Sequence, residues 1–414
     1  MSDAAAGLDR IARAEHGRIV STLTRLLGSL DLAEEAAQEA YVVAARTWPG
    51  SGVPPNPGAW LTTTARRRAI DRIRRESRRD AKQQEATVLA GLEPDPHPLD
   101  PPSGVADDRL RMIFTCCHPA LDPASQVALC LKVLGGLTTA EVAAAFLIAE
   151  PAMAKRLTRT KAKIAAAKIP YRVPADAELA SRVRGALATL YLIYNEGYLP
   201  GGSLAQDAIR PELTSEAIRL VRLVVALMPD EAEAIGLLAL MLLTDARRPA
   251  RVVGERLVTL DEQDRSRWDR AMVAEGHALV RDCLRRGRPG RYQLLAAVGA
   301  VHTDAATAAQ TDWRQILALY DQLYALEPTA VVGLNRAVAV AEVEGPPAGL
   351  AALEQLPGRA GLERYHAFHA TCAELLRRAG RSAEAAAAYE RALELATNPA
   401  ERTLLAQRRA SILG

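Results

Sequence analysis

Apolar residues recur at helical spacing at the start of the chain and predict two successive helices there. The first lies within residues 11–30 and has the apolar set Ile11, Ile19, Leu23, Leu26 and Leu27. The second is expected to begin with a cap at Asp31, supported by the carboxylate of Glu34 three residues later, and to end near Thr47. Its apolar stripe consists of Ala33, Ala37, Ala40, Ala44 and Trp48.

Asn56 and Pro57 are typical of the start of a third helix. One side of this helix is expected to be buried through Leu61, Ala65, Ala69 and Ile73. The rest of its surface and the residues that follow carry Arg66, Arg67, Arg68, Arg72, Arg74, Arg75, Arg78 and Arg79. A solvated helix face normally mixes charges of both signs at i,i+4 spacing. Because this face is almost entirely basic, we expect it to bind an anion such as a phosphate backbone.

Residues 83–107 lack the helical apolar pattern of the preceding segments. They contain five prolines, Pro94, Pro96, Pro98, Pro101 and Pro102, which forbid a continuous helix, so a semi-extended linker is predicted. A helix is expected over residues 109–117, and Asp122 with Pro123 favours the start of another that runs from Ser125 to Leu134.

The stretch from Gly135 to Ile164 predicts two short helices joined by a tight connection. Thr138 and Glu141 have the spacing of a capping box, and Glu150 with Pro151 begins the second helix. That helix has Met153, Leu157 and Ile164 on one side and Lys155, Arg156, Arg159, Lys161 and Lys163 over much of the rest. The pattern is that of a helix-turn-helix whose second helix enters the major groove of DNA. An ordinary helical hairpin with a solvated basic face is the alternative.

The chain remains helical in pattern beyond residue 172 but is no longer basic. A tyrosine-rich motif stands out there, formed by Tyr191, Tyr194, Asn195, Glu196, Gly197 and Tyr198. Helices are predicted to end before Pro229, Pro328 and Pro399, which indicates a weak repeat. The spacing of Gly380, Ala385, Tyr389 and Ala392 resembles the second helix of a tetratricopeptide (TPR) repeat. A generic alanine-rich helical bundle is the alternative.

Composition supports an all-α protein of two or three domains, because 49% of the 414 residues are hydrophobic and only 4% aromatic. Charge is unevenly distributed. Residues 66–82 hold nine basic and three acidic side chains, and residues 150–172 hold seven and one. The whole chain has 52 basic and 49 acidic residues, so 36 basic and 45 acidic residues lie outside these two segments. Two short cationic segments in an otherwise acidic chain are the footprint of a nucleic-acid binder.

Other classes of protein find less support. The five cysteines form no disulfide framework, and Cys116-Cys117-His118 lacks a second ligand pair at zinc spacing, so we expect neither a metal nor a cofactor. No signal peptide or membrane span is evident, which predicts a cytoplasmic protein. An enzyme that uses Glu196, or His366 and His369, is the weaker alternative, since these residues have no clear partner and no phosphate loop accompanies them. We therefore expect a protein that is not an enzyme.

Taken in order, residues 10–172 resemble an RNA polymerase sigma factor of the extracytoplasmic-function (ECF) type in the sigma-70 family. The likeness rests on AEEAAQEAYVVAARTWP, on NPGAWLTTTARRRAIDRIRRESRR and on the helix-turn-helix. The resemblance implies that Glu34, Glu35, Gln38 and Glu39 face the clamp of the polymerase β′ subunit. It implies promoter contacts by Trp60, Arg66, Arg68, Asp71, Arg72, Arg74 and Arg75, and by Ala152, Lys155, Arg156, Arg159 and Lys161. The domains expected are sigma region 2 (1–82), the linker (83–107), sigma region 4 (108–172) and a C-terminal TPR-like domain (173–414).

A sigma factor of this type ends near residue 172, whereas this chain continues for about 240 residues. The extension and its tyrosine motif resemble the subgroup called group 42. That resemblance implies that the extension takes the regulatory place of a membrane anti-sigma factor, and that a small DGPF-type protein is a partner. The alternative function is a stand-alone helix-turn-helix transcription regulator with a TPR-like sensor domain.

Overall fold

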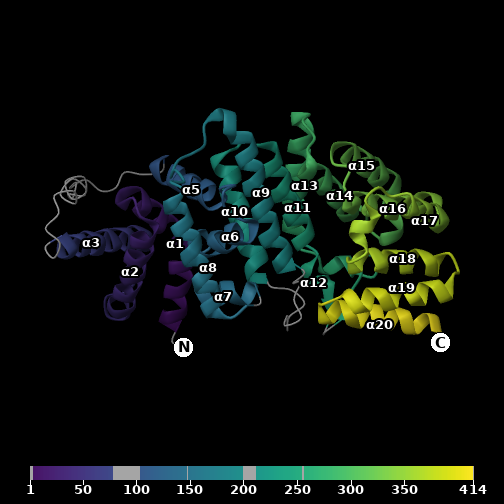
Figure 1. Cartoon of the computed structure of the whole chain (residues 1–414), viewed down its shortest axis with the longest axis horizontal. Coiled ribbons are helices and arrows are strands. Elements are labelled where there is room, and N and C mark those ends of the chain that lie inside the picture. The colour runs from purple at the N-terminus through teal and green to yellow at the C-terminus, as the bar shows by residue number, and fades with distance from the viewer. Residues whose placement is uncertain (1–2, 78–102, 147, 199–210, 254–255, 414) are drawn as a thin grey trace. The chain divides into compact units, whose positions relative to one another are not determined.

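The computed structural model describes residues 3–77, 103–146, 148–198, 211–253 and 256–413 (Figure 1). The expectation of an all-α fold is confirmed, and the described strands are limited to an antiparallel pair of two residues each. The chain forms two compact units, residues 1–192 and 193–414.

The elements of the first unit are α1 (Asp3–Leu27), α2 (Leu30–Ser51), α3 (Pro57–Ser77), α5 (Ser103–Cys116), α6 (Pro123–Leu129), the π-helical turn η1 (Cys130–Leu134), α7 (Thr139–Ala145), α8 (Glu150–Ala166) and the greater part of α9 (Asp176–Tyr198).

The elements of the second unit are α10 (Pro211–Leu227), α11 (Ala232–Asp245), α12 (Arg248–Arg251), β1 (Val252–Val253), β2 (Arg256–Leu257), η2 (Arg265–Arg267), α13 (Arg270–Arg286), α14 (Arg291–Asp304), η3 (Ala308–Gln310), α15 (Trp313–Leu326), α16 (Ala330–Glu344), α17 (Pro346–Glu354), η4 (Arg359–Leu362), α18 (His366–Arg378), α19 (Ser382–Leu395) and α20 (Pro399–Leu413).

Helices α1, α2 and α3 pack against one another, as the apolar pattern predicts. The stripe on α2 is buried, and Ala33, Ala37, Ala40 and Ala44 are fully inaccessible to solvent. The predicted cap at Asp31 is wrong. The hydroxyl of Ser29 instead accepts a hydrogen bond from the backbone N–H of Leu32, and α2 begins at Leu30 and ends at Ser51. Asp31 therefore lies within the first turn of the helix, and its carboxylate does not cap the helix start.

Helix α3 begins where the sequence indicates. The side-chain oxygen of Asn56 accepts a hydrogen bond from the backbone N–H of Ala59 at 3.1 Å, which satisfies one of the N–H groups that a helix start leaves open. The predicted inner face of α3 is confirmed, since Leu61, Ala65, Ala69 and Ile73 are all buried.

The second half of this unit contains the predicted helix-turn-helix. The capping box is present: Thr138 Oγ1 accepts from Glu141 N, and Glu141 Oε2 accepts from Thr138 N. Met153 and Leu157 on α8 are buried. Asp122 caps α6, also as expected, but the helix continues into the π-helical turn η1 from Cys130.

Helix α5 begins earlier than the sequence indicates. Residues 103–107 of the predicted linker already belong to α5, and residues 83–102 lie outside the described part of the chain. Helix α1 packs on both α5 and η1. A Cβ atom at Gly17 of α1 would lie 2.7 Å from the carbonyl oxygen of Leu134, so the absence of a side chain there permits the close approach. The helices around α1 and those of the helix-turn-helix thus form one packed body.

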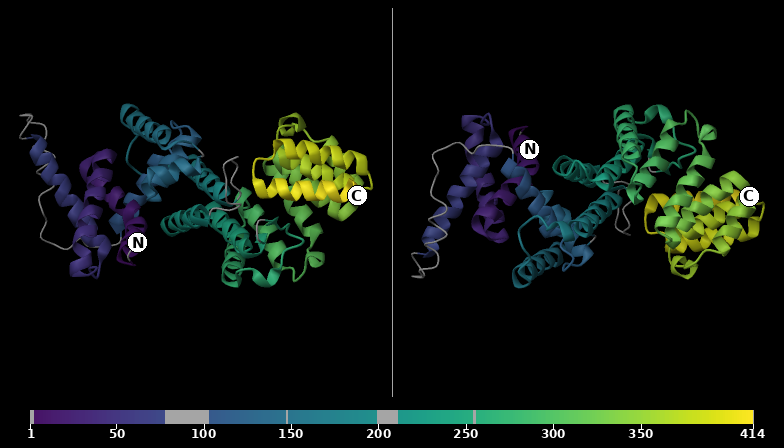
Figure 2. Two further views of the ribbon diagram at one scale, coloured as in Figure 1. Left: turned by 90° about the horizontal axis from the view of Figure 1, so that it is seen from below. Right: turned by 90° about the horizontal axis from the view of Figure 1, so that it is seen from above.

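The second unit consists of successive helices that pack on their neighbours, and α18, α19 and α20 lie side by side (Figures 1 and 2). Helices end before Pro229, Pro328 and Pro399, as predicted. Ala385, Tyr389 and Ala392 point into the core between these last helices, and Gly380 has φ +77° at the turn that precedes α19. The repeat-like pattern therefore describes buried positions, while its assignment to the TPR class stays a prediction.

Candidate nucleic-acid interface

Helix α3 presents three of its seven predicted DNA-contacting residues to solvent. Arg68, Asp71 and Arg74 are exposed, whereas Arg66 and Arg72 are half-buried, and the side chain of Arg75 lies outside the described part of the structure. Trp60 is half-buried at the start of the helix and packs edge-on against Trp48 of α2, with ring centroids 5.4 Å apart. The exposed side of α3 therefore combines cationic side chains with a partly accessible aromatic ring.

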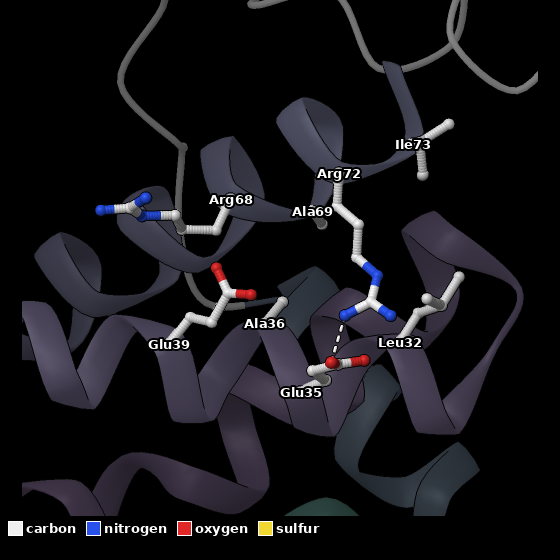
Figure 3. Close-up of a pocket in the computed structure, with 8 residues that line it drawn as sticks. All are labelled: Leu32, Glu35, Ala36, Glu39, Arg68, Ala69, Arg72 and Ile73. Atoms are coloured by element: carbon white, nitrogen blue, oxygen red, sulfur yellow. Dashed lines mark ion pairs between the residues drawn. The ribbon is translucent and has the colours of Figure 1, made fainter. Parts of the chain in front are cut away.

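A pocket lies between α2 and α3 and brings the two predicted contact sets together (Figure 3). Glu35 and Glu39 project from α2, and Arg68 and Arg72 project from α3. Arg72 forms an ion pair with Glu35, which is drawn as a dashed line in Figure 3. Gln38 is exposed on α2. The acidic residues predicted to face polymerase and the basic residues predicted to face DNA thus adjoin on two neighbouring helices.

Helix α8 carries the second basic surface. Ala152, Lys155 and Arg159 are exposed along it, as a helix that reads the major groove requires. Arg156 is half-buried because its guanidinium group stacks over the ring of Phe146, 5.4 Å from the centroid. The outer side of α8 is therefore an accessible cationic strip next to the turn of the motif.

Lys161 lies elsewhere on α8 and does not face solvent as the others do. Its ammonium group is 2.9 Å from Glu34 Oε2 and 2.5 Å from Asp31 Oδ1, both on α2. Only 20% of the Lys161 side chain and 10% of the Glu34 side chain are exposed. Burial works against the charged form of Lys161, but the two carboxylates outweigh it and raise its pKa. One predicted DNA contact and one predicted polymerase contact are therefore bound to each other.

Further ion pairs join α1 to α7 and to α5 within the first unit. Arg13 of α1 forms an ion pair with Glu141 of α7 at 2.7 Å. Arg25 of α1 forms one with the buried Asp108 of α5 at 2.9 Å. No local sequence signal identifies these partners, because they are more than 80 residues apart and each residue by itself resembles an ordinary surface charge.

The tyrosine motif forms the C-terminal end of α9, where its side chains pack against residues of the second unit. Tyr194 is buried and its hydroxyl donates to the carbonyl oxygen of Met241 at 3.2 Å. Tyr198 stacks on Tyr194 and lies under the guanidinium of Arg251, 4.4 Å from the ring centroid. Tyr191 is half-buried and Asn195 exposed, and the side chain of Glu196 lies outside the described part of the structure. In this structure the motif has a packing role.

A groove of about 830 Å³ opens inside the second unit. Its lining includes three ion pairs between different helices: Arg378 with Glu342, Arg408 with Glu374, and His366 with Glu401. The carboxylate of Glu401 raises the pKa of His366. Cationic and anionic side chains are balanced in this lining, so the groove shows no single-sign surface that would attract nucleic acid.

The described residues contain no group of three His, Cys, Asp or Glu side chains arranged to hold a metal ion. Cys116, Cys117 and Cys130 are buried, and the sulfur atoms of Cys117 and Cys130 lie 3.5 Å apart. None of the helices that the structure describes is long and apolar enough to cross a membrane. His366 and His369 stand at the start of α18, where His366 is paired with Glu401 and His369 with the backbone carbonyl of Glu363.

Comparison with known proteins assigns two parts of the chain to families. Residues 11–79 match the family model of Sigma-70 region 2, and residues 182–284 match a family of unknown function, DUF6596. Uncharacterized protein R00370 of Rhizobium meliloti (strain 1021) is 42% identical over 386 residues, which cover 92% of this chain and 90% of that protein.

Two relatives carry a functional name. The ECF RNA polymerase sigma factor SigK of Mycolicibacterium vanbaalenii is 31% identical over 134 residues, and that of Mycobacterium ulcerans is 33% identical over 129. The matched segments cover 30% of this chain in each case, and 63% and 66% of the two SigK proteins. The region 2 match includes all of α2 and α3, the helices that carry the first acidic and basic surfaces. The chain therefore belongs to the sigma-70 family, as an RNA polymerase sigma factor of the extracytoplasmic-function group that carries a C-terminal extension.

Proposed function

We propose that this sigma factor binds core RNA polymerase through the acidic face of α2 and places α3 and α8 on two elements of promoter DNA. The observation that carries the proposal is the presence of two exposed cationic helix faces, on α3 and α8, in one unit with the acidic face of α2. The arginines and lysines supply an attraction to phosphates that weakens with salt. Base edges read by α8 supply selection of roughly 1 to 3 kcal/mol for each good contact. The protein acts in the cytoplasm and performs no covalent chemistry.

The paired rings of Trp48 and Trp60 suit a role in promoter opening. Opening requires that at least one base leave the stack, at a cost of a few kcal/mol. A base that stacks on an aromatic side chain recovers roughly 1 to 3 kcal/mol. Because Trp60 is partly exposed at the start of the basic helix, its ring is available to a base next to the phosphates that α3 contacts.

Run-off transcription with purified core polymerase tests this function. We expect transcripts only when core polymerase and this chain are both present. Strong specific binding to the same promoter without polymerase, together with no transcript, would favour the stand-alone regulator and contradict the proposal. Promoters are found by running the assay on fragments of the genome of the source organism.

The C-terminal extension is proposed to regulate this activity, as in group 42, with a small DGPF-type protein as partner. Two observations support it. The extension is a compact unit of its own with an open groove, and Tyr194 of the tyrosine motif is packed within that unit. The first part of α9 contacts α5 and α6 instead, through Arg182 to the carbonyl oxygen of Phe114 and through Thr189 to Gln126.

A chain that ends after Leu192 keeps these last contacts and loses the second unit. We compare its promoter output and polymerase affinity with those of the full chain. Higher output indicates that the extension inhibits, and lower output that it is required. Equal output and equal affinity would contradict a regulatory role. The DGPF-type protein is expected to bind the full chain and not the shortened one.

A further inference from the structure

A third cationic segment lies in the C-terminal extension, at residues 281–291, and is here named the arginine turn. It holds one acidic residue, Asp282, and five arginines, Arg281, Arg285, Arg286, Arg288 and Arg291. The rest of residues 173–414 holds 23 basic and 29 acidic residues. Positive charge is therefore gathered at one place in an extension that is otherwise acidic, as it is in the two basic segments of the first unit.

The arginine turn spans the end of α13, the four residues that follow it and the first residue of α14. The two helices pack against each other (Figure 1). Arg281 and Arg285 are exposed one helical turn apart on α13, and Arg288 and Arg291 are exposed beyond its end. The arginines are thus presented together at one end of the α13–α14 pair.

Glu233 of α11 holds this turn in place. Its carboxylate accepts hydrogen bonds from the backbone N–H groups of Tyr292 at 3.1 Å and Gln293 at 3.4 Å. The side-chain amide of Gln293 donates to the carbonyl oxygen of Arg288 at 2.8 Å. A Cβ atom at Gly290 would overlap the carboxylate of Glu233, so glycine permits the close approach. The backbone that carries Arg288 is therefore fixed, while the residue itself stays exposed.

Folding leaves part of the charge of the arginine turn unpaired. Asp282 already pairs with two of its arginines, and Arg291 pairs with Glu327 at 3.2 Å. Arg281 and Arg288 form no ion pair within the part of the chain that the structure describes. Arg288 and Arg291 also lie at the start of α14, where the helix dipole favours an anion over a cation. Positive charge gains little for the fold at these positions, so it fits an external anion.

Duplex DNA is the anion that suits this surface. Protein interfaces are centred on clusters of apolar or aromatic side chains. The structure describes the whole arginine turn, and Leu284 is the one large apolar side chain that is exposed there. Exposed guanidinium groups bind phosphates without such a cluster. The composition of the surface therefore favours a phosphate backbone over an acidic protein.

We propose that the arginine turn binds the phosphate backbone of promoter DNA, in the duplex next to the element read by α8 and on the side away from the element contacted by α3. Helix α9 begins in the first unit and ends in the second, so the second unit stays tethered to the part of the chain that carries α8. A tethered surface needs little affinity of its own to occupy nearby phosphates. This inference rests on the proposed function and adds a DNA contact made by the extension.

Two matched double variants test the arginine turn. Arg281→Gln with Arg288→Gln removes its two unpaired charges and breaks no ion pair of the described residues. Arg314→Gln with Arg364→Gln is the control, because it removes two exposed arginines of the same unit, one on α15 and one between η4 and α18. Both variants should keep the circular dichroism spectrum of the unaltered chain.

The first measurement uses the free full chain and a short duplex of unrelated sequence. Each phosphate contact contributes about 0.9 to the slope of log K against log salt, so Arg281→Gln with Arg288→Gln should reduce the slope by about 2. The control variant should keep the slope of the unaltered chain. This measurement needs neither polymerase nor a known promoter.

The second measurement uses the complex with core polymerase and two promoter fragments. One fragment ends at the element read by α8, and the other extends about 20 base pairs, two helical turns, beyond it. On the longer fragment, the affinity advantage of the unaltered chain over Arg281→Gln with Arg288→Gln should shrink about tenfold between roughly 50 and 200 mM salt. On the shorter fragment the two chains should bind alike.

The outcomes separate the arginine turn from the sigma function. Equal salt slopes for the two double variants overturn the DNA contact, and an equal advantage on both fragments overturns its position. A loss of polymerase affinity by Arg281→Gln with Arg288→Gln in the absence of DNA also overturns it, because the turn then contacts an acidic protein surface. If the slopes differ as expected but core polymerase yields no transcript with the unaltered chain, the proposed function fails and the DNA contact stands.

Discussion

Lys161 of the recognition helix lies 2.9 Å from Glu34 of α2, across 127 positions of sequence. Two residues that the family resemblance assigns to different macromolecular contacts thus neutralise each other in the free chain. Glu34 is buried and Lys161 is partly buried, and the neighbouring pair of Arg13 with Glu141 lies on the same interface. The two parts of the first unit that are proposed to recognise separate promoter elements are in this way kept together by charge as well as by apolar packing.

The tyrosine motif should be sensitive to one added methyl group. A Cβ atom at Gly197 would lie 2.7 Å from the backbone nitrogen of Thr214 and 2.8 Å from the Cβ of Leu213. Gly197→Ala should therefore push α10 away from α9 and destabilise the second unit by about 1 to 3 kcal/mol. Urea unfolding followed by circular dichroism measures the change.

Gly185 in the same helix provides the control. A Cβ atom at that position would have no neighbour within 4 Å. Gly185→Ala should stabilise the chain by up to about 1 kcal/mol, because alanine is the better helix former. Equal effects of the two substitutions would contradict the close packing of the motif.

His16 should make the first unit sensitive to acid. It is 3% exposed and hydrogen-bonded to the hydroxyl of Tyr41. Burial and the nearby charge of Lys132 lower its pKa to about 4. The unfolded chain takes up the proton near pH 6.5, so stability is lost as pH falls from about 6.5 towards 4, by roughly 3 kcal/mol at most. His16→Gln should flatten the pH dependence of the unfolding free energy over this range.

His366 should behave in the opposite way. The carboxylate of Glu401 raises its pKa, so its contribution is fully present below about pH 6.5 and is lost as pH rises through the raised value. His366→Gln should therefore cost more stability at pH 5.5 than at pH 8. If both histidine variants changed the pH profile in the same direction, one of the two burial and pairing assignments would be wrong.

Arg68 offers the cleanest test of the basic face of α3. It is exposed, whereas Arg72 on the same helix is engaged by Glu35. In the complex with core polymerase, Arg68→Ala should weaken promoter binding and reduce the slope of log K against log salt by about 1. Arg314→Ala, which removes an exposed arginine of α15 in the second unit, should leave the slope unchanged. An unchanged slope for Arg68→Ala would exclude a phosphate contact at that position.

Much of the architecture was accessible from the sequence because it depends on local patterns. Helical periodicity identified the buried stripe of α2 and the inner face of α3, and the Thr138 to Glu141 spacing identified the capping box. The two basic segments and the order of the motifs identified the family. These features arise from residues within a few positions of one another, where spacing alone decides which side chains share a face.

Other features depend on contacts between distant segments, and only the tertiary structure decided them. Asp31 resembles a cap in sequence, but Ser29 takes that role and leaves Asp31 to Lys161. Glu34, Lys161 and Arg13 have the ordinary signature of surface charges, and their burial follows from the packing of α1 and α2 against the helix-turn-helix. A sequence pattern records which side of a helix is apolar. It does not record which charged side chain another part of the chain brings to that helix, and the two predicted contact surfaces of this chain meet at such a contact.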